Sequence, residues 1–385
     1  MPPIIPSVPV SPPLPPARER KPVLRYVLYV LATLLLAGAG AVVAVFFVWH
    51  PSSRPIALPD SSPSSTTAAY LKQHSLFLIN ESPHPGQGGS GPMTSSIYTV
   101  HADGTGKTLL TNNGGAPSWT PDGKIIFASS RSGSQQIWIM DANGSNALQI
   151  GNLPASTLPV MPQEGENGLI VLMGNDATTE PDGNTGIWMM QSDGSGLTEL
   201  VHGMQPSLAL SGRWIAYTLQ TDTPYHREIW RINTDGTGLK QLTFLGDDPD
   251  YPDANAPNIS PDEQTMAFFS GKESDRAVPG APQQPVFTFG HRNVAIVPAT
   301  GGARTTLTPC QPVTTQAELD AATEASGNCI AADNPAWTPD SKWLIFDTGF
   351  STGGGTWMVD VNGQNYQQFY SQGRGIVRVP LKFVN

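Results

Sequence analysis

The chain has 385 residues, a formal net charge of −10 at pH 7 and two cysteines. An acidic surface repels nucleic acid phosphates and anionic headgroups, so this charge excludes a nucleic-acid-binding protein. With 39% hydrophobic residues, the chain is long and apolar enough to bury a substantial core.

Residues 1–25 are predicted to be a cytoplasmic, proline-rich tail. Nine prolines fall between positions 2 and 22, and they favour polyproline II structure without a core. Two interpretations stay open: the tail makes a cytoplasmic contact with an aromatic-groove domain, or it is a disordered lead-in to the next segment.

Residues 26–49 contain no charged side chain and are long enough for one transmembrane helix. Basic residues precede this segment and only Arg54 follows closely, which predicts a cytoplasmic N-terminus and an extracytoplasmic remainder. The alternative is a signal peptide that is removed. Residues 50–69 are rich in Ser and Pro and are interpreted as a linker.

A repeated motif occupies the rest of the chain. Residues 117–127 and 335–346 share Pro-x-Trp-Thr-Pro-Asp, and weaker copies occur at 206–217 and 257–268. Pro-x-Trp is interpreted as a first strand, Pro-Asp-Gly as a turn and the apolar run as a second strand. A motif that recurs in this way along the chain is typical of one supersecondary unit that stacks on its neighbours.

Each motif is followed by an apolar third strand and a polar turn. In Ile137-Trp-Ile-Met, apolar side chains point to both faces, so the strand requires cover on both sides, as between stacked sheets. The Asn-Gly or Asp-Gly turns that follow are predicted to be hairpin turns of the primed type.

These motifs resemble the WD40-like repeat of the TolB family, of tricorn-type proteases and of prolyl-oligopeptidase relatives. The resemblance covers roughly residues 70–370 and implies a β-propeller. It implies no single function, because the repeat occurs in proteins with different activities. The α/β domain that precedes the propeller in TolB has no counterpart in this sequence.

The predicted fold class is therefore all-β: a six-bladed β-propeller of four-stranded antiparallel blades over residues 70–385, preceded by one transmembrane helix. The first blade lacks its own first strand, and a strand at 375–379 is expected to pair beside Leu76–Ile79 and complete it. The third strands of the six blades begin at Ile97, Ile137, Ile187, Ile229, Val294 and Thr356.

Cys310 and Cys329 enclose an 18-residue segment and are predicted to form a disulfide in an oxidising compartment, with free thiols as the alternative. No cofactor and no catalytic residue is predicted, because the sequence contains neither Gly-x-Ser-x-Gly nor His-Glu-x-x-His. The tryptophans are interpreted as core between blades rather than as a sugar-binding platform.

An acidic loop is the one local cluster of charged residues that stands out. Oxygen ligands at this density suit Ca²⁺, although the spacing does not match an EF-hand, and a solvated loop is the alternative. The candidate Ca²⁺ ligands are Asp247, Asp248, Asp250 and Asp253.

The long segments are predicted to be the 2–3 and 4–1 loops, which open at one mouth of the propeller, whereas the 1–2 and 3–4 turns on the other face are short. Any ligand site is therefore expected at that mouth, near blades four to six. Alanine there should change stability by no more than about 0.5 kcal/mol. The candidate binding residues are Asp247, Asp250, Asp253, Asn255, His291, Asp333 and Asn334.

The sequence thus predicts a membrane-anchored, extracytoplasmic module of the cell envelope that binds or scaffolds a protein or a glycan. The alternative is an envelope enzyme of the lyase, cyclotransferase or hydrolase-like kind, with its site in the mouth of the propeller. An enzyme needs at least two titratable groups within hydrogen-bond reach of each other beside a shared pocket.

Overall fold

The computed structural model describes residues 76–81, 95–101, 105–175, 185–221, 226–246, 248, 253–278, 281–308, 335–348, 355–370 and 376–378. The chain divides into two compact units, Met1–Ser52 and Ser53–Asn385, and every described residue belongs to the second. The predicted tail, span and linker lie outside the described residues. Among the residues that are described, no helix is both long and apolar enough to cross a bilayer.

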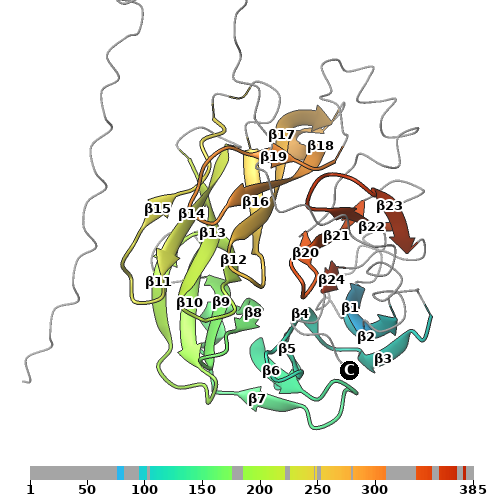
Figure 1. Cartoon of the computed structure of the whole chain (residues 1–385). Coiled ribbons are helices and arrows are strands. Elements are labelled where there is room, and N and C mark those ends of the chain that lie inside the picture. Colours follow the sequence, from blue (N-terminus) through green and yellow to red (C-terminus); the bar gives the residue numbers. More distant parts are fainter. Residues whose placement is uncertain are drawn as a thin grey trace, which may run out of the picture. The chain divides into compact units, whose positions relative to one another are not determined.

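The described strands form six four-stranded antiparallel sheets, which follow one another along the chain (Figure 1). We number them in chain order. Sheet one consists of β24 (Ile376–Arg378), β1 (Leu76–Glu81), β2 (Ser96–His101) and β3 (Thr108–Thr111). Sheet two consists of β4 (Gly115–Trp119), β5 (Ile125–Ser129), β6 (Gln136–Met140) and β7 (Leu148–Ile150). Sheet three consists of β8 (Val160–Glu164), β9 (Leu169–Asn175), β10 (Thr185–Gln191) and β11 (Thr198–His202), and the short 3-10 helix η1 (Ala155–Thr157) precedes it.

The remaining sheets repeat this order. Sheet four consists of β12 (Met204–Leu208), β13 (Trp214–Gln220), β14 (Arg227–Asn233) and β15 (Lys240–Gln241). Sheet five consists of β16 (Asp253–Ile259), β17 (Thr265–Val278), β18 (Ala281–Pro298) and β19 (Thr305–Thr306). Sheet six consists of β20 (Ala336–Trp337), β21 (Trp343–Thr348), β22 (Gly355–Asp360) and β23 (Gln367–Tyr370). The predicted all-β propeller of four-stranded antiparallel blades is confirmed.

The C-terminal strand completes the first sheet, as predicted. In β24, Arg378 pairs with Leu78 of β1, and Ile376 pairs with Asn80. The same strand contacts β4 of sheet two and β21 of sheet six. Sheet one therefore lies between the second and the last sheet, and its first strand comes from the far end of the chain.

The core lies between the sheets. Trp214 and Ile229 of sheet four pack with Met266 and Phe268 of sheet five in one buried cluster, and Trp337 of sheet six packs against sheet five in another. Apolar side chains on both faces of a strand therefore find cover on both sides, as the sequence predicted. These tryptophans belong to the core and not to a sugar-binding surface.

The innermost strands share a bulge that places a non-glycine residue at positive φ just before a proline. The register of each of four strands shifts at this point. A non-glycine residue in this region costs about 1–2 kcal/mol. The four residues are Ala116 (φ 47°), Met161 (53°), Gln205 (52°) and Ala256 (51°).

Ala116→Gly is expected to raise the free energy of unfolding by about 0.5 kcal/mol, because relief of the positive φ outweighs the added freedom of the unfolded chain. Ala128 of β5 is the matched control, since it sits in a regular strand and is buried. Ala128→Gly should destabilise by about 1 kcal/mol. Urea unfolding of both variants measures the difference, and equal losses in the two would contradict the strain argument.

The polar turns differ from the prediction. In the β6–β7 turn, the Gly144 amide donates to the Asp141 carbonyl oxygen at 2.8 Å and the Asp141 amide donates to that of Ser145 at 2.9 Å. Gly144 has φ 84°, whereas Asn143 is not among the residues with positive φ. The primed two-residue turn was therefore wrong: this is a three-residue loop, a type I turn followed by a left-handed glycine.

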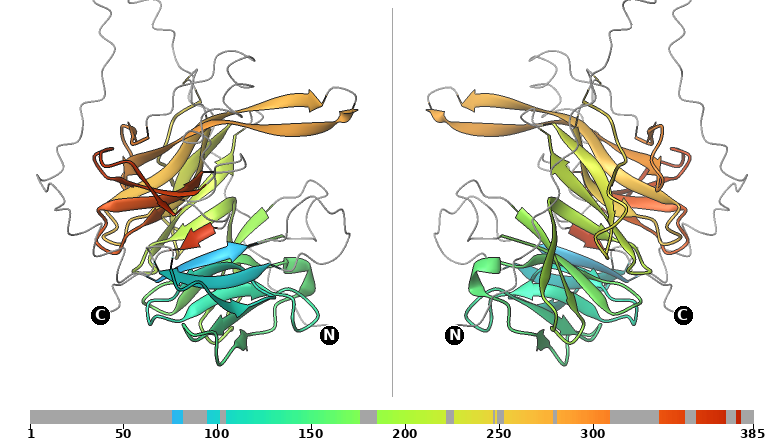
Figure 2. Two further views of the ribbon diagram at one scale, coloured as in Figure 1. Left: turned by 90° about the vertical axis from the view of Figure 1, so that its right-hand side faces the viewer. Right: turned by 90° about the vertical axis from the view of Figure 1, so that its left-hand side faces the viewer.

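Two elements of the fold were not predicted. Strand β8 carries a further copy of the motif, Met161-Pro-Gln, without the tryptophan that marks the others. Residues 270–291 were expected to be a loop, but they extend β17 and β18 into a long hairpin (Figure 2). The run has few apolar residues and three prolines, so its strand pattern is weak.

Candidate functional site

The axis of the propeller holds a small cavity. It is lined by β4, β8, β12, β16 and β20, and its volume is about 90 Å³, enough for a few water molecules. One of its polar side chains is already paired: Gln163 donates to the Pro206 carbonyl oxygen at 2.7 Å and accepts from the Leu208 amide at 2.9 Å. Among the residues that the structure describes, no titratable side chain lines this cavity.

Most of the predicted binding residues lie outside the described residues, namely Asp247, Asp250, Asp333 and Asn334. Cys310 and Cys329 also lie outside them, so the disulfide stays a prediction. His291 falls in β18 rather than in a loop. The mouth of the propeller as a ligand site likewise stays a prediction.

Asp253 and Asn255 are described, and both are buried. Asp253 is 0% exposed and Asn255 is 2% exposed. Arg227 donates two side-chain hydrogen bonds to the Asp253 carboxylate, from Nε to Oδ1 at 2.8 Å and from Nη2 to Oδ2 at 2.7 Å. The backbone amide of Arg227 also donates to Oδ1 at 3.0 Å. Asn255 Nδ2 donates to Oδ2 at 2.6 Å. This burial does not fit the expectation that alanine at these two positions changes stability by no more than about 0.5 kcal/mol.

The Ca²⁺ hypothesis loses support at the two candidate ligands that the structure describes, Asp248 and Asp253. Asp253 is bound by Arg227, and Asp248 Oδ2 lies 2.7 Å from Nη2 of Arg304. A carboxylate held by a guanidinium is a poor ligand for a cation, because the two positive charges repel each other. Within the described part of the chain, no group of three acidic, His or Cys side chains suits a metal ion.

Glu228 accepts hydrogen bonds from the residues that immediately precede the acidic loop. Its Oε1 accepts the amides of Leu245 at 2.6 Å and Gly246 at 3.0 Å, and Oε2 accepts the Thr243 hydroxyl at 2.5 Å. The side chain is buried. Desolvation raises the pKa of Glu228 above its ordinary value, and the three hydrogen bonds offset part of that rise.

Glu228 is expected to make stability depend on pH. Because the pKa of the folded form is raised, the native state binds the proton more tightly than the unfolded chain. The contribution of Glu228 to the free energy of unfolding is then fully present below the ordinary pKa of 4.5, and it is lost as pH rises through the raised pKa of the folded state. Urea unfolding of wild type and Glu228→Gln across this range measures it. A stability difference that does not change with pH would contradict the assignment.

A second, larger recess lies on the short-turn face of sheet four. We call it the sheet-four cleft; it is open and encloses about 570 Å³, within the range of ligand-binding pockets. It is bounded by the β12–β13 turn, by β14 and the turn after it, and by turns of sheets three and five. Its walls include Ser211, Arg213, Trp214, Arg231, Asp235 and Glu263.

Glu263 fixes one wall of the sheet-four cleft. Its Oε1 accepts the Ser211 amide at 2.7 Å, and its Oε2 accepts the indole N–H of Trp214 at 2.9 Å. Glu263 has φ 59°, at a turn position that Gly123 and Gly212 occupy in other sheets. Such strain persists where surrounding contacts hold it, and here the two hydrogen bonds tie sheet five to sheet four.

Arg231 forms the opposite wall. Its guanidinium carbon lies 4.0 Å from the centroid of the Trp214 ring, a cation–π contact that fixes the plane of the group. Nη1 also donates to the Ala299 carbonyl oxygen at 3.3 Å. The cleft is on the face opposite to the predicted mouth. The sequence analysis did not predict this cleft, although a basic residue in the otherwise apolar third strand could have indicated it.

Comparison with known proteins identifies the fold. A scan against protein-family models found no match, and neither did a search of curated proteins. Among solved structures, TolB from Acinetobacter baumannii is 15% identical with a TM-score of 0.55, over 80% of this chain and 66% of that one. A putative TolB from Agrobacterium tumefaciens is 14% identical with a TM-score of 0.52, over 74% of this chain and 91% of that one.

Hydrazine synthase from Kuenenia stuttgartiensis is also similar, at 13% identity and a TM-score of 0.54, over 82% of this chain and 47% of that one. Identities this low establish architecture and carry no activity from one protein to another. Together with the repeated motif and the four-stranded sheets, the comparisons show that the chain has a TolB-like β-propeller fold.

Proposed function

We propose that the chain is a membrane-anchored, extracytoplasmic propeller that binds another protein of the cell envelope. The six sheets are proposed to be six blades of one closed ring. The observation that carries the binding role is the open sheet-four cleft, which lies beside strands whose apolar side chains are buried between the sheets. Binding sites are commonly built this way, on a rigid scaffold.

An enzyme is less well supported by the same observations. General acid–base chemistry needs two titratable groups in reach of each other beside a cavity. In the part of the chain that the structure describes, no titratable group lines the axial cavity. In the sheet-four cleft, Glu263 accepts two neutral donors and Asp235 accepts from Thr237. Nothing in the described residues therefore favours the enzyme over the binding module.

The proposed location follows from the uncharged residues 26–49 and the basic residues before them. With a tag at each end of the chain, a protease added to intact cells should remove the propeller and leave the N-terminal tag intact. Mass spectrometry of the mature protein should find the N-terminus before residue 26. A mature N-terminus after residue 42, or a chain in the soluble fraction, would reject the anchor.

Protein binding is tested by cross-linking in intact cells, followed by purification of the full chain in detergent. The expected result is recovery of one extracytoplasmic protein in amounts comparable to the propeller. Recovery of glycan alone would overturn the protein-binding proposal in favour of a glycan-binding module. Recovery of cytoplasmic proteins alone would contradict the envelope role, unless they are bound through the proline-rich tail, which deletion of residues 1–22 would reveal.

A further inference from the structure

We propose that the sheet-four cleft binds a carboxylate group, presented by an acidic segment of the partner protein. The inference rests on the proposed protein binding and adds the chemistry of the contact. The first observation concerns Arg231: the equivalent residue in the other sheets that resemble sheet four is apolar. By register, Ile139 in β6, Met189 in β10 and Met358 in β22 stand at the same place. The fold therefore does not require an arginine there.

The cations of the cleft have unused donors. Arg231 bonds only to the Ala299 carbonyl oxygen through Nη1, which leaves Nε and Nη2 without a partner among the described residues. Arg213 is exposed, and its guanidinium makes no ion pair or hydrogen bond within the same residues. A guanidinium whose plane is already fixed loses less entropy on binding.

The two acids of the cleft already accept hydrogen bonds from neutral groups, Glu263 through both oxygens and Asp235 through Oδ1. Both carboxylate oxygens of Glu263 accept neutral donors of sheet four. Asp235 accepts the amide and the hydroxyl of Thr237 at 2.9 Å and 2.6 Å, and these hydrogen bonds lower its pKa. The cleft thus offers free N–H donors and few free acceptors, which suits an anionic ligand.

The charge balance selects a carboxylate over a phosphate. Two acids lie beside the two arginines of the cleft, so each further negative charge on a ligand adds repulsion. A phosphate monoester carries about −1.5 to −2 at pH 7 and would be repelled more strongly by Glu263. A carboxylate matches the paired N–H groups of a guanidinium edge. Because the recess is open, an extended segment can present an Asp or Glu side chain to it.

The experiment uses the full chain in detergent micelles at about 0.15 M salt, where surface charges are screened beyond about 8 Å. A labelled peptide of alternating Gly and Glu is titrated by fluorescence anisotropy, beside a matched Gly–Gln peptide and free glutarate. The variants are Arg231→Met and Arg231→Lys. Met stands at this position in β10 and β22, so the fold tolerates it, and thermal unfolding verifies each variant.

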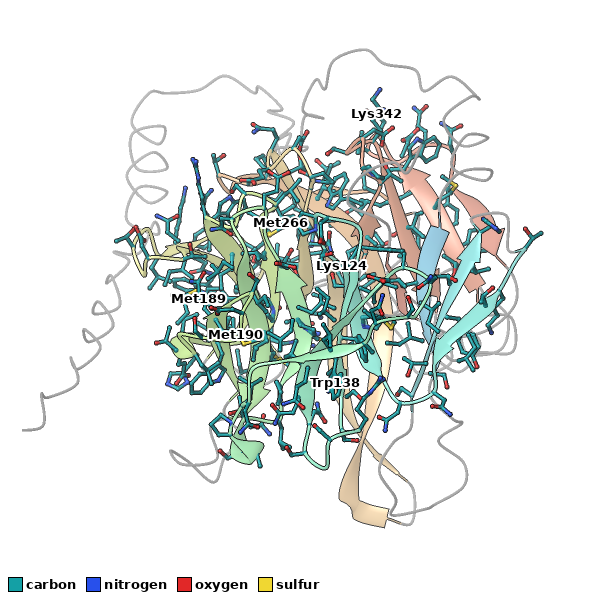
Figure 3. The ribbon with its side chains drawn as sticks, turned by 90° about the horizontal axis from the view of Figure 1, so that it is seen from below. Lys124, Trp138, Met189, Met190, Met266 and Lys342 are labelled. Atoms are coloured by element: carbon teal, nitrogen blue, oxygen red, sulfur yellow. The ribbon has the colours of Figure 1, made fainter. Side chains whose placement is uncertain are left out.

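Lys342→Gln is the matched control. Lys342 follows the 1–2 turn of sheet six as Arg213 follows that of sheet four, and it projects from the sheets on its own (Figure 3). The expected result is that the Glu peptide binds and that the Gln peptide and Arg231→Met each reduce affinity about tenfold or more. Arg231→Lys should fall between, and Lys342→Gln should stay within about twofold of wild type.

The inference would be overturned by no binding of the Glu peptide, by wild-type affinity in Arg231→Met, or by equal losses in Arg231→Met and Lys342→Gln. Binding of glutarate without the peptide would also overturn it, since the ligand would then be a free small carboxylate. If peptide binding fails while cross-linking still recovers an envelope protein, the inference falls and the proposed function stands. If the peptide binds and no protein is recovered, the proposed function falls.

Discussion

Asp253→Ala is expected to lower the free energy of unfolding by about 3–5 kcal/mol, because it removes the buried carboxylate that pairs with two nitrogens of the Arg227 guanidinium. The side chain of Arg227 is 16% exposed and that of Asp253 is fully buried. Asn255 would lose its acceptor as well. Urea unfolding at pH 7 measures the change, and Asp253→Asn should be milder because it retains an acceptor oxygen.

Asp235→Ala provides the control for this prediction. Asp235 is exposed and accepts only from Thr237 in its own turn, so its loss should cost no more than about 0.5 kcal/mol. The double variant Arg227→Leu with Asp253→Leu should lose less than the two single variants combined, since apolar replacement of a buried ion pair removes both desolvation costs. If Asp253→Ala were as mild as Asp235→Ala, the buried pair would not matter for stability.

A chain that ends at Ser371 is expected to be less stable by about 3 kcal/mol, and to melt as a whole rather than locally. It lacks β24, whose three residues pair with β1, and each lost hydrogen bond costs about 1 kcal/mol. Because β24 also contacts β4 and β21, its removal weakens sheet one against both neighbours. Calorimetry should show one transition at a lower temperature.

The matched control is a chain that ends at Pro380, which keeps β24 and should melt close to the full chain. Truncation removes the pairing of β24 with β1 together with its contacts to β4 and β21, so the loss of stability in the shorter chain should be cooperative. A second, separate transition for sheet one would contradict the account. An unchanged melting temperature in the chain ending at Ser371 would show that β24 contributes nothing to closure.

The strands could be predicted because their sequence pattern has a local physical cause. The turn glycines and the apolar runs, such as Ile125 to Ala128, place strands by periodicity and turn geometry alone. The role of β24 was predictable because sheet one lacked a strand and an open edge is unfavourable. Strand β8 was missed because Met161-Pro-Gln lacks the tryptophan that marks the other copies.

The polar contacts could not be predicted in the same way. Asp253 was grouped with the acidic loop because its sequence neighbours are acidic, whereas it opens a buried strand and pairs with Arg227, 26 positions earlier. Sequence distance does not reveal which strands face each other across a sheet boundary. The sheet-four cleft was missed for a different reason. Loop length was used as the guide to function, yet Arg231 lies within a strand.

Closure by β24 also bears on how the protein is made. Leu78 meets its partner Arg378 only after about 300 further residues have been synthesised. Until then the edge of β1 has no strand beside it, and unpaired edges invite association with other chains. Contacts this distant in sequence also slow folding, since a long loop must close first. The unpaired edge of β1 is therefore exposed to association until β24 has been synthesised. The yield of folded protein should accordingly depend on the supply of chaperones.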